Sequence, residues 1–185
     1  VDLRNNGGGS LSKVVEIAGL FIKEGPVVQV RDAERNIQVL SDTDSSTQWD
    51  KPLVILINEL SASASEILAA AMQDYGRAII IGSKQSYGKG TVQELIDLNR
   101  EIRNSSLGDL GAIKLTRQKF YRINGGSTQL KGVNSDVVIP DRYQYIKVGE
   151  REMENPMPWD EIPKANYTRW SENQNFPTAI ANSKK

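Results

Sequence analysis

The spacing of apolar residues predicts regular elements in the first part of the chain. Apolar side chains recur at helical intervals over 11–21, so we expect a helix that begins at Ser10 and ends before Gly25. Two short apolar runs, at 27–30 and 37–40, lie on either side of a charged turn and predict a hairpin. This part of the chain is therefore expected to form a helix followed by two paired strands.

The next apolar segments alternate between strand and helix patterns. The uninterrupted apolar run at 53–57 is typical of a strand that is buried on both faces of a layered sheet. It leads into a helix rich in small residues that is expected to end near Tyr75. Further strands are expected at 78–81, 91–98, 113–122 and 137–139, with a mobile polar loop at 99–109. This alternation indicates an α/β fold with a mainly parallel central sheet.

The two ends of the chain depart from this pattern. Residues 1–4 are typical of the end of a strand and are followed at once by a turn, which suggests a truncated fragment. After Gln144 the sequence becomes polar, with scattered prolines and aromatic residues. We therefore divide the chain into a core, residues 1–144, and a C-terminal arm, residues 145–185, which is expected to hold one short helix.

The overall composition restricts the class of partner. Hydrophobic residues make up 38% of the chain, which is enough for a core of ordinary size. Lysine and arginine together number 23, as do aspartate and glutamate, so no basic excess is available to attract nucleic acid or an anionic membrane. No apolar run approaches the roughly 18 residues that a membrane span requires.

Two residue types are missing from the chain, namely cysteine and histidine. Without cysteine there can be no disulfide, no thiolate zinc site and no cysteine nucleophile. Without histidine there can be no Ser-His-Asp triad and no histidine-based metal site. Any acid–base chemistry near neutral pH must therefore use lysine, aspartate, glutamate or tyrosine.

Three serines at the start of the second predicted helix are candidate nucleophiles, namely Ser61, Ser63 and Ser65. Backbone N–H groups at a helix N-terminus are unpaired and stabilise a negatively charged oxygen. However, Ser63 and Glu66 also fit the Ser-x-x-Glu capping box, in which the serine needs no catalytic role. The spacing of Ser63 and Glu66, taken alone, favours a capping role for Ser63 over a role as nucleophile.

A lysine in the loop that follows could serve as the base in place of histidine. Lys89 lies between two glycines, which allow close backbone approach. If a strand begins there, Lys89 and Gln93 share one face, and Gln93 could orient the amine. Lys84 in the same loop is an alternative that spacing does not separate from Lys89. The structural alternative is that Lys89 is an ordinary solvated lysine.

A glycine-rich turn, residues 6–9, precedes the first predicted helix. Such turns present backbone N–H groups to an oxyanion or a phosphate. The turn lacks the terminal lysine and hydroxyl residue of a Walker motif, so nucleotide binding is weakly indicated. Most turns of this composition are simply tight turns.

Together these segments resemble the C-terminal processing peptidases, and the likeness covers residues 1–142 in order. It is carried by the segments Asp2–Gly9, Ser61–Ile67 and Tyr87–Gln93. Two further segments, residues 125–133 and Pro158-Trp159-Asp160, resemble the tail-specific protease branch of that family.

This resemblance implies a serine endopeptidase with a Ser–Lys dyad on a crotonase-like or Clp-protease-like layered α/β core. Ser63 would be the nucleophile, Lys89 the general base and Gln93 its support. The backbone N–H of Ala64 would form the oxyanion hole together with a glycine of the pair Gly8 and Gly9. No cofactor and no metal are implied.

The resemblance also implies partners and a compartment. Substrates would be unfolded or C-terminally tagged polypeptides, recognised by apolar C-termini through a PDZ domain that this chain lacks. Family members are typically periplasmic or otherwise exported. Two other functions remain open: a catalytically latent peptide-binding fragment, and a crotonase-type enzyme acting on acyl thioesters, which would not need a serine facing a lysine.

Overall fold

The computed structural model describes residues 1–102, 108–170 and 176–183, which form two sheets with helices between them. The first sheet is antiparallel, in the order β2-β1-β6-β5. Its strands are β1 (Gly25–Arg31), β2 (Ile37–Asp42), β5 (Thr91–Asp97) and β6 (Ala112–Tyr121). The second sheet is parallel, in the order β3-β4-β7. Its strands are β3 (Leu53–Ile57), β4 (Ala78–Gly82) and β7 (Val137–Val138).

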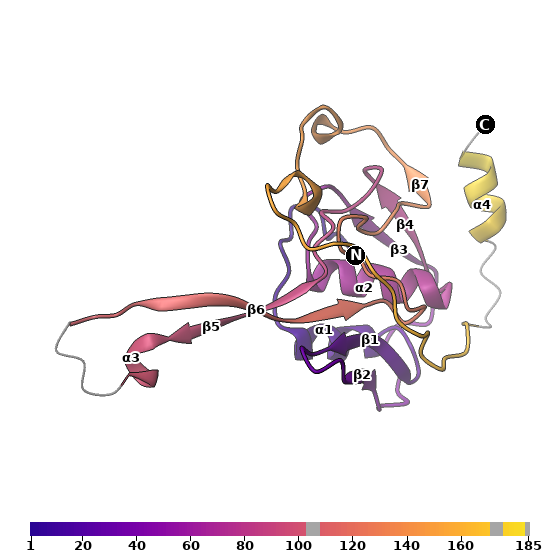
Figure 1. Cartoon of the computed structure of the whole chain (residues 1–185). Coiled ribbons are helices and arrows are strands. Elements are labelled where there is room, and N and C mark those ends of the chain that lie inside the picture. The colour runs from indigo at the N-terminus through magenta and orange to yellow at the C-terminus, as the bar shows by residue number, and fades with distance from the viewer. Residues whose placement is uncertain (103–107, 171–175, 184–185) are drawn as a thin grey trace.

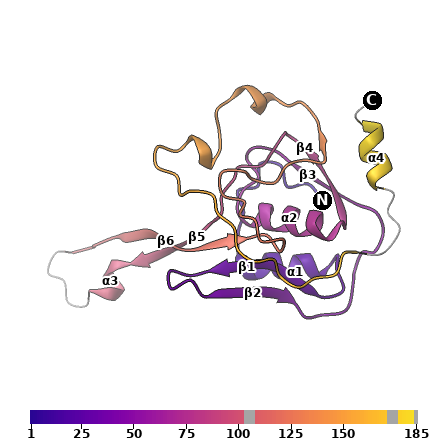
Figure 2. The same ribbon diagram turned by 45° about the vertical axis from the view of Figure 1, so that its right-hand side comes forward.

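Two helices, α1 (Leu11–Gly19) and α2 (Ala64–Tyr75), contact each other between the sheets, as Figures 1 and 2 show. The remaining helical elements are short, namely α3 (Leu98–Glu101), η1 (Arg142–Tyr145), η2 (Glu150–Glu152) and α4 (Phe176–Ser183). None of the helices in the described ranges has the length and apolar character needed to cross a membrane.

Local sequence signals explain where the two central helices begin and end. Ser10 caps α1 by accepting a hydrogen bond from the backbone N–H of Lys13. Gly76 ends α2 in the left-handed conformation that glycine adopts without strain. Because α2 is packed on several sides, ten of its residues are buried, and most of these are small or aliphatic. The resulting core fixes the first turn of α2, which carries the candidate serines.

The structure confirms the α/β class, the parallel sheet, the first helix and the hairpin. It differs from the sequence prediction at β3, which is not buried on both faces, since Val54 is 39% exposed. The alternation of elements also did not reveal a separate antiparallel sheet. Within the predicted polar loop at 99–109, residues up to Glu101 are helical, and 103–107 lie outside the described residues.

Two parts of the chain extend beyond this layered core. Strands β5 and β6 project from the body as a two-stranded hairpin, with α3 near the far end (Figures 1 and 2). The C-terminal arm instead returns to the core, where the N–H of Ala165 donates to the carbonyl of Ile123 at 2.8 Å. The base of the projecting hairpin and the start of α2 both contribute to the site described next.

Candidate active site

A cleft of about 350 Å³ opens between the start of α1, the start of α2 and the base of β5. Of the residues predicted to carry the chemistry, five line this cleft, namely Gly9, Ser63, Ala64, Lys89 and Gln93. The remaining lining residues are Gly7, Leu11, Ile67, Thr91, Val92, Lys114 and Phe120. Tertiary folding therefore brings together three segments that are far apart in the sequence.

The three candidate serines have different surroundings. The hydroxyl of Ser61 is buried and donates to the carbonyl of Leu3 at 2.8 Å. The hydroxyl of Ser65 is also buried and donates to the carbonyl of Asn6 at 3.0 Å. Ser63 is half-buried and is the one serine of the three that lines the cleft. Accessibility thus separates serines that spacing alone could not.

The backbone of Ser63 has an unusual conformation. Ser63 and Glu66 occupy the two positions of the predicted capping box, and Glu66 Oε2 accepts the N–H of Ser63 at 2.8 Å. An N-cap residue ordinarily has extended dihedral angles, but Ser63 has φ 57° and ψ −116°. A non-glycine residue in such a region costs about 1–3 kcal/mol, and such strain is concentrated at functional sites. A serine that served only as a cap would not need this conformation.

Two backbone N–H groups at the cleft are available to an oxyanion. Within the described ranges, no acceptor is hydrogen-bonded to the N–H of Ala64 or of Gly9. The N–H of Gly8, in contrast, donates to Oδ1 of Asn6 at 2.9 Å. Of the predicted pair of glycines, the structure therefore leaves Gly9 free and engages Gly8.

Gly8 has a steric role beside Ser63. It adopts φ +106°, and a methyl group on its Cα would lie 2.7 Å from Ser63 Cβ and 2.9 Å from the Ala64 nitrogen. We predict that Gly8→Ala lowers kcat/KM for peptide hydrolysis by about 10²-fold, because a shift of about 1 Å at a reacting group has an effect of that size. Steady-state kinetics on the purified full-length variant measures this.

Gly7 provides the matched control. A methyl group there would meet no heavy atom within 4 Å, and its φ is not positive. Gly7→Ala is therefore expected to have a far smaller effect on kcat/KM than Gly8→Ala. Equal losses in the two variants would contradict a steric requirement at Gly8.

The predicted contact between Lys89 and Gln93 is present in the structure. Nζ of Lys89 donates to Oε1 of Gln93 at 3.1 Å, so the two side chains share one face of the strand as expected. Among the described residues, no hydrogen bond joins Lys89 Nζ to Ser63 Oγ. Catalytic hydrogen bonds are often long before substrate binds. Lys84 is exposed and does not line the cleft, so the structure separates the two lysines.

Glu66 connects the serine segment to the lysine segment. Its side chain is fully buried, and its two oxygens accept four hydrogen bonds. The donors are the N–H groups of Ser63 (2.8 Å), Gly88 (2.7 Å) and Lys89 (3.0 Å), and the hydroxyl of Ser86 (2.6 Å). The sequence identified Glu66 only as half of a capping box, because its other partners lie 20 to 23 positions away in the chain.

Burial also changes the acidity of Glu66. Loss of solvent raises the pKa of its carboxyl to about 7 from 4.5, although all four hydrogen bonds oppose this rise. The folded state thus retains a proton that the unfolded chain releases at lower pH. The stabilising contribution is full below pH 4.5 and is lost as the pH rises to about 7, by about 3 kcal/mol in total.

We predict that this pH dependence is absent in Glu66→Gln, whose side chain does not titrate. The measurement is the urea midpoint of unfolding for wild type and variant between pH 4.5 and 8. The difference in stability between the two proteins should shrink as the pH rises, since the other titrating groups are common to both. A difference that stays constant across this range would show that Glu66 does not titrate there.

The cleft also contains residues that the sequence did not single out. Lys114 and Phe120 reach it from β6, a strand that was predicted without any link to the site. Their position depends on the pairing of β5 with β6, for which the local sequence carries no signal. Within the part of the chain that the structure describes, no three acidic side chains are grouped closely enough to hold a metal ion.

Two family models match the chain. One, for peptidase family S41, matches residues 1–139. The other is described as the C-terminal domain of tail specific protease (DUF3340) and matches residues 143–185.

Individual relatives and structures are consistent with these matches. The chain is 53% identical to a tail-specific protease of Haemophilus influenzae over 90% of its length, and 38% identical to a carboxy-terminal-processing protease of Bartonella bacilliformis over 83%. It spans only 24% and 35% of those proteins, respectively. Among solved structures, the photosystem II D1 C-terminal processing protease aligns with a TM-score of 0.60 at 32% identity, covering 75% of this chain and 33% of that one.

A more distant likeness concerns the fold alone. A lipoprotein from Streptococcus agalactiae aligns with a TM-score of 0.58 at 18% identity, over 77% of this chain and 50% of that one. The layered arrangement therefore extends to proteins with little sequence similarity.

Proposed function

Because the chain belongs to peptidase family S41, we propose that its cleft cleaves peptide bonds by a Ser–Lys dyad. Ser63 is the nucleophile, Lys89 the general base and Gln93 the group that orients the lysine. The observation that carries this proposal is the shared cleft, in which a strained serine at a helix N-terminus lies with a lysine bonded to Gln93.

The proposed reaction proceeds through an acyl-enzyme. Unprotonated Lys89 takes the proton from Ser63 Oγ as the oxygen attacks the scissile carbonyl, and the C–O bond forms. The N–H groups of Ala64 and Gly9 stabilise the resulting oxyanion. The lysine ammonium then protonates the leaving amine as the C–N bond breaks. Water, deprotonated by the same lysine, hydrolyses the ester and releases Ser63.

We further propose that residues 1–144 form the protease core and that 145–185 begin a C-terminal region. The substrates are unfolded or C-terminally tagged polypeptides with apolar C-termini, and the full-length protein includes a PDZ domain and acts in the periplasm or another exported location. The two family models support the division of the chain, and the names of the relatives support substrates that are processed at a C-terminus. The PDZ domain, the apolar C-termini and the compartment rest on the family resemblance described in the sequence analysis.

The test is active-site labelling of the full-length protein with a serine-directed fluorophosphonate, followed by peptide mass spectrometry. We expect the label on Ser63, with no label after denaturation, and cleavage of an unfolded protein substrate that stops once labelling is complete. A label on Ser65, or unchanged cleavage after full labelling, would contradict the dyad. Substrate binding without any cleavage would favour the latent peptide-binding alternative.

A further inference from the structure

The backbone at Lys89 is fixed on two sides by different parts of the chain. Glu66 accepts the N–H of Lys89, as described above. On the other side, the hydroxyl of Thr128 donates to the carbonyl of Lys89 at 2.8 Å, and the N–H of Leu130 donates to the carbonyl of Gly88 at 2.7 Å. The turn at 127–130 therefore helps to set the position from which the lysine side chain leaves the backbone.

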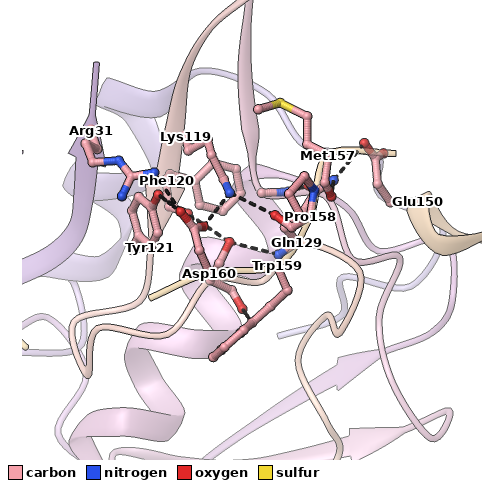
Figure 3. A network of polar contacts seen from close by, with 12 residues as sticks. Arg31, Lys119, Phe120, Tyr121, Gln129, Glu150, Met157, Pro158, Trp159 and Asp160 are labelled. Carbon is pink, nitrogen blue, oxygen red and sulfur yellow. Dashed lines mark hydrogen bonds and ion pairs between the residues drawn. The ribbon is translucent and has the colours of Figure 1, made fainter. Parts of the chain in front are cut away.

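Gln129, at the centre of this turn, joins the lysine loop to the C-terminal arm. Its side chain is 0% exposed, and Oε1 accepts the N–H of Gly90 at 2.8 Å. Its Nε2 donates to the carbonyl of Met157 at 3.1 Å and to Glu150 Oε1 at 3.3 Å. Figure 3 shows Gln129 facing Met157 and Glu150. Since one end meets a donor and the other meets two acceptors, only one orientation of the amide satisfies all three contacts.

Gly90 and Gln129 are packed so closely that no side chain would fit between them. A methyl group on Gly90 would lie 2.7 Å from the backbone nitrogen of Gln129 and 2.8 Å from its Cβ. The two backbones thus touch directly, and a displacement of Gln129 is transmitted to the residue that follows Lys89.

The part of the arm that reaches Gln129, residues 149–160, is anchored at both ends, and we call it the docking segment. At one end, the N–H of Glu150 donates to the carbonyl of Tyr87 at 3.0 Å. At the other, Asp160 binds Arg31 at 2.6 Å together with Lys119 and Tyr121, as drawn in Figure 3.

We infer that Gln129 is a positioning residue through which the docking segment holds Lys89 in place. When the segment is docked, the Gln129 amide has its full set of partners and fixes Gly90. When the segment is released, the two N–H groups of the buried amide lose their acceptors, and the amide no longer holds a single orientation. The inference rests on the proposed function of Lys89 and assigns a role in the chemistry to a region outside the protease core.

The first test compares Gln129→Met with a matched control, Gln73→Met, in the full-length protein. Gln73 also accepts one hydrogen bond, from Arg122, and donates two, to Asn134 and Asp136, but it lies outside the cleft. We expect kcat of Gln129→Met to fall by about 10- to 100-fold with KM changed less than about twofold, while Gln73→Met keeps its kcat. Equal kcat values in the two variants would overturn the inference.

The second test does not depend on activity or on the folding of Gln129→Met. Asp160→Asn weakens the anchor of the docking segment at a residue that does not itself line the cleft. Hydrogen–deuterium exchange is expected to become faster at 88–90 as well as at 149–160, with α2 unchanged. Faster exchange at 149–160 alone would overturn the inference. Cleavage that persists in Ser63→Ala would instead overturn the proposed function and leave this coupling intact.

Discussion

Replacing Ser63 by alanine is expected to lower kcat for hydrolysis of an unfolded protein by about 10⁴-fold or more, to near the background rate. The reason is that Ser63 Oγ forms the covalent bond in the proposed reaction, and no other hydroxyl of the α2 turn is free to replace it. Ser61 and Ser65 are both buried and hydrogen-bonded to backbone carbonyls. Substrate cleavage by the full-length variant, followed by gel electrophoresis, measures the loss.

Ser65→Ala is the control for this experiment. It removes a hydroxyl two residues away and one hydrogen bond to Asn6, whose carbonyl still accepts the N–H of Ala62. The expected cost is about 1 kcal/mol of stability with activity retained. Persistent cleavage by Ser63→Ala, or equal losses in the two variants, would exclude Ser63 as the nucleophile.

Replacing Lys89 by alanine is expected to lower kcat by about 10³-fold, within the range that a general base contributes. The amine that takes the proton from Ser63 is lost, and Gln93 loses the group it orients. Lys89→Arg tests whether Lys89 acts as a proton acceptor or only as a positive charge. Arginine keeps a cation in the cleft but remains protonated, so this variant should be as inactive as Lys89→Ala. The measurement is kcat for both variants under identical conditions.

Lys84→Ala is the matched control for the lysine. The Lys84 side chain is exposed, and its backbone carbonyl, which accepts the N–H of Ser135, is kept in the variant. We expect wild-type kcat. Loss of activity in Lys84→Ala with retention in Lys89→Ala would reverse the assignment, and activity in Lys89→Arg would show that a positive charge alone suffices.

The sequence predicted the elements that depend on local chemistry. The helix after Ser10 follows from the helical spacing of its apolar residues, and the end of α2 follows from the capping glycine Gly76. Both signals act within a few positions of the chain. The burial of β3 was predicted wrongly because it depends on what covers each face, which a single strand does not encode.

For the candidate site, the sequence predicted which types of residue are involved but not the contacts that surround them. Spacing left three serines and two lysines as candidates, and the resemblance to the C-terminal processing peptidases favoured Ser63 and Lys89. The absence of histidine had already made lysine a candidate base. The sequence could not distinguish Gly8 from Gly9, because the N–H of Gly8 is engaged by a side chain whose direction depends on the folded turn. Nor could it show that Glu66 accepts donors from a loop more than twenty residues away.

The sequence by itself excluded cysteine- and histidine-based chemistry, because neither residue occurs in the chain. It also predicted the position of the local elements, because helical and strand periods act over short distances. The tertiary structure decided which serine is accessible, which N–H groups are free and which segments hold Lys89. These properties depend on contacts between distant parts of the chain, such as Gln129 with Met157, and such contacts exist only once the sheets have paired and the core has closed.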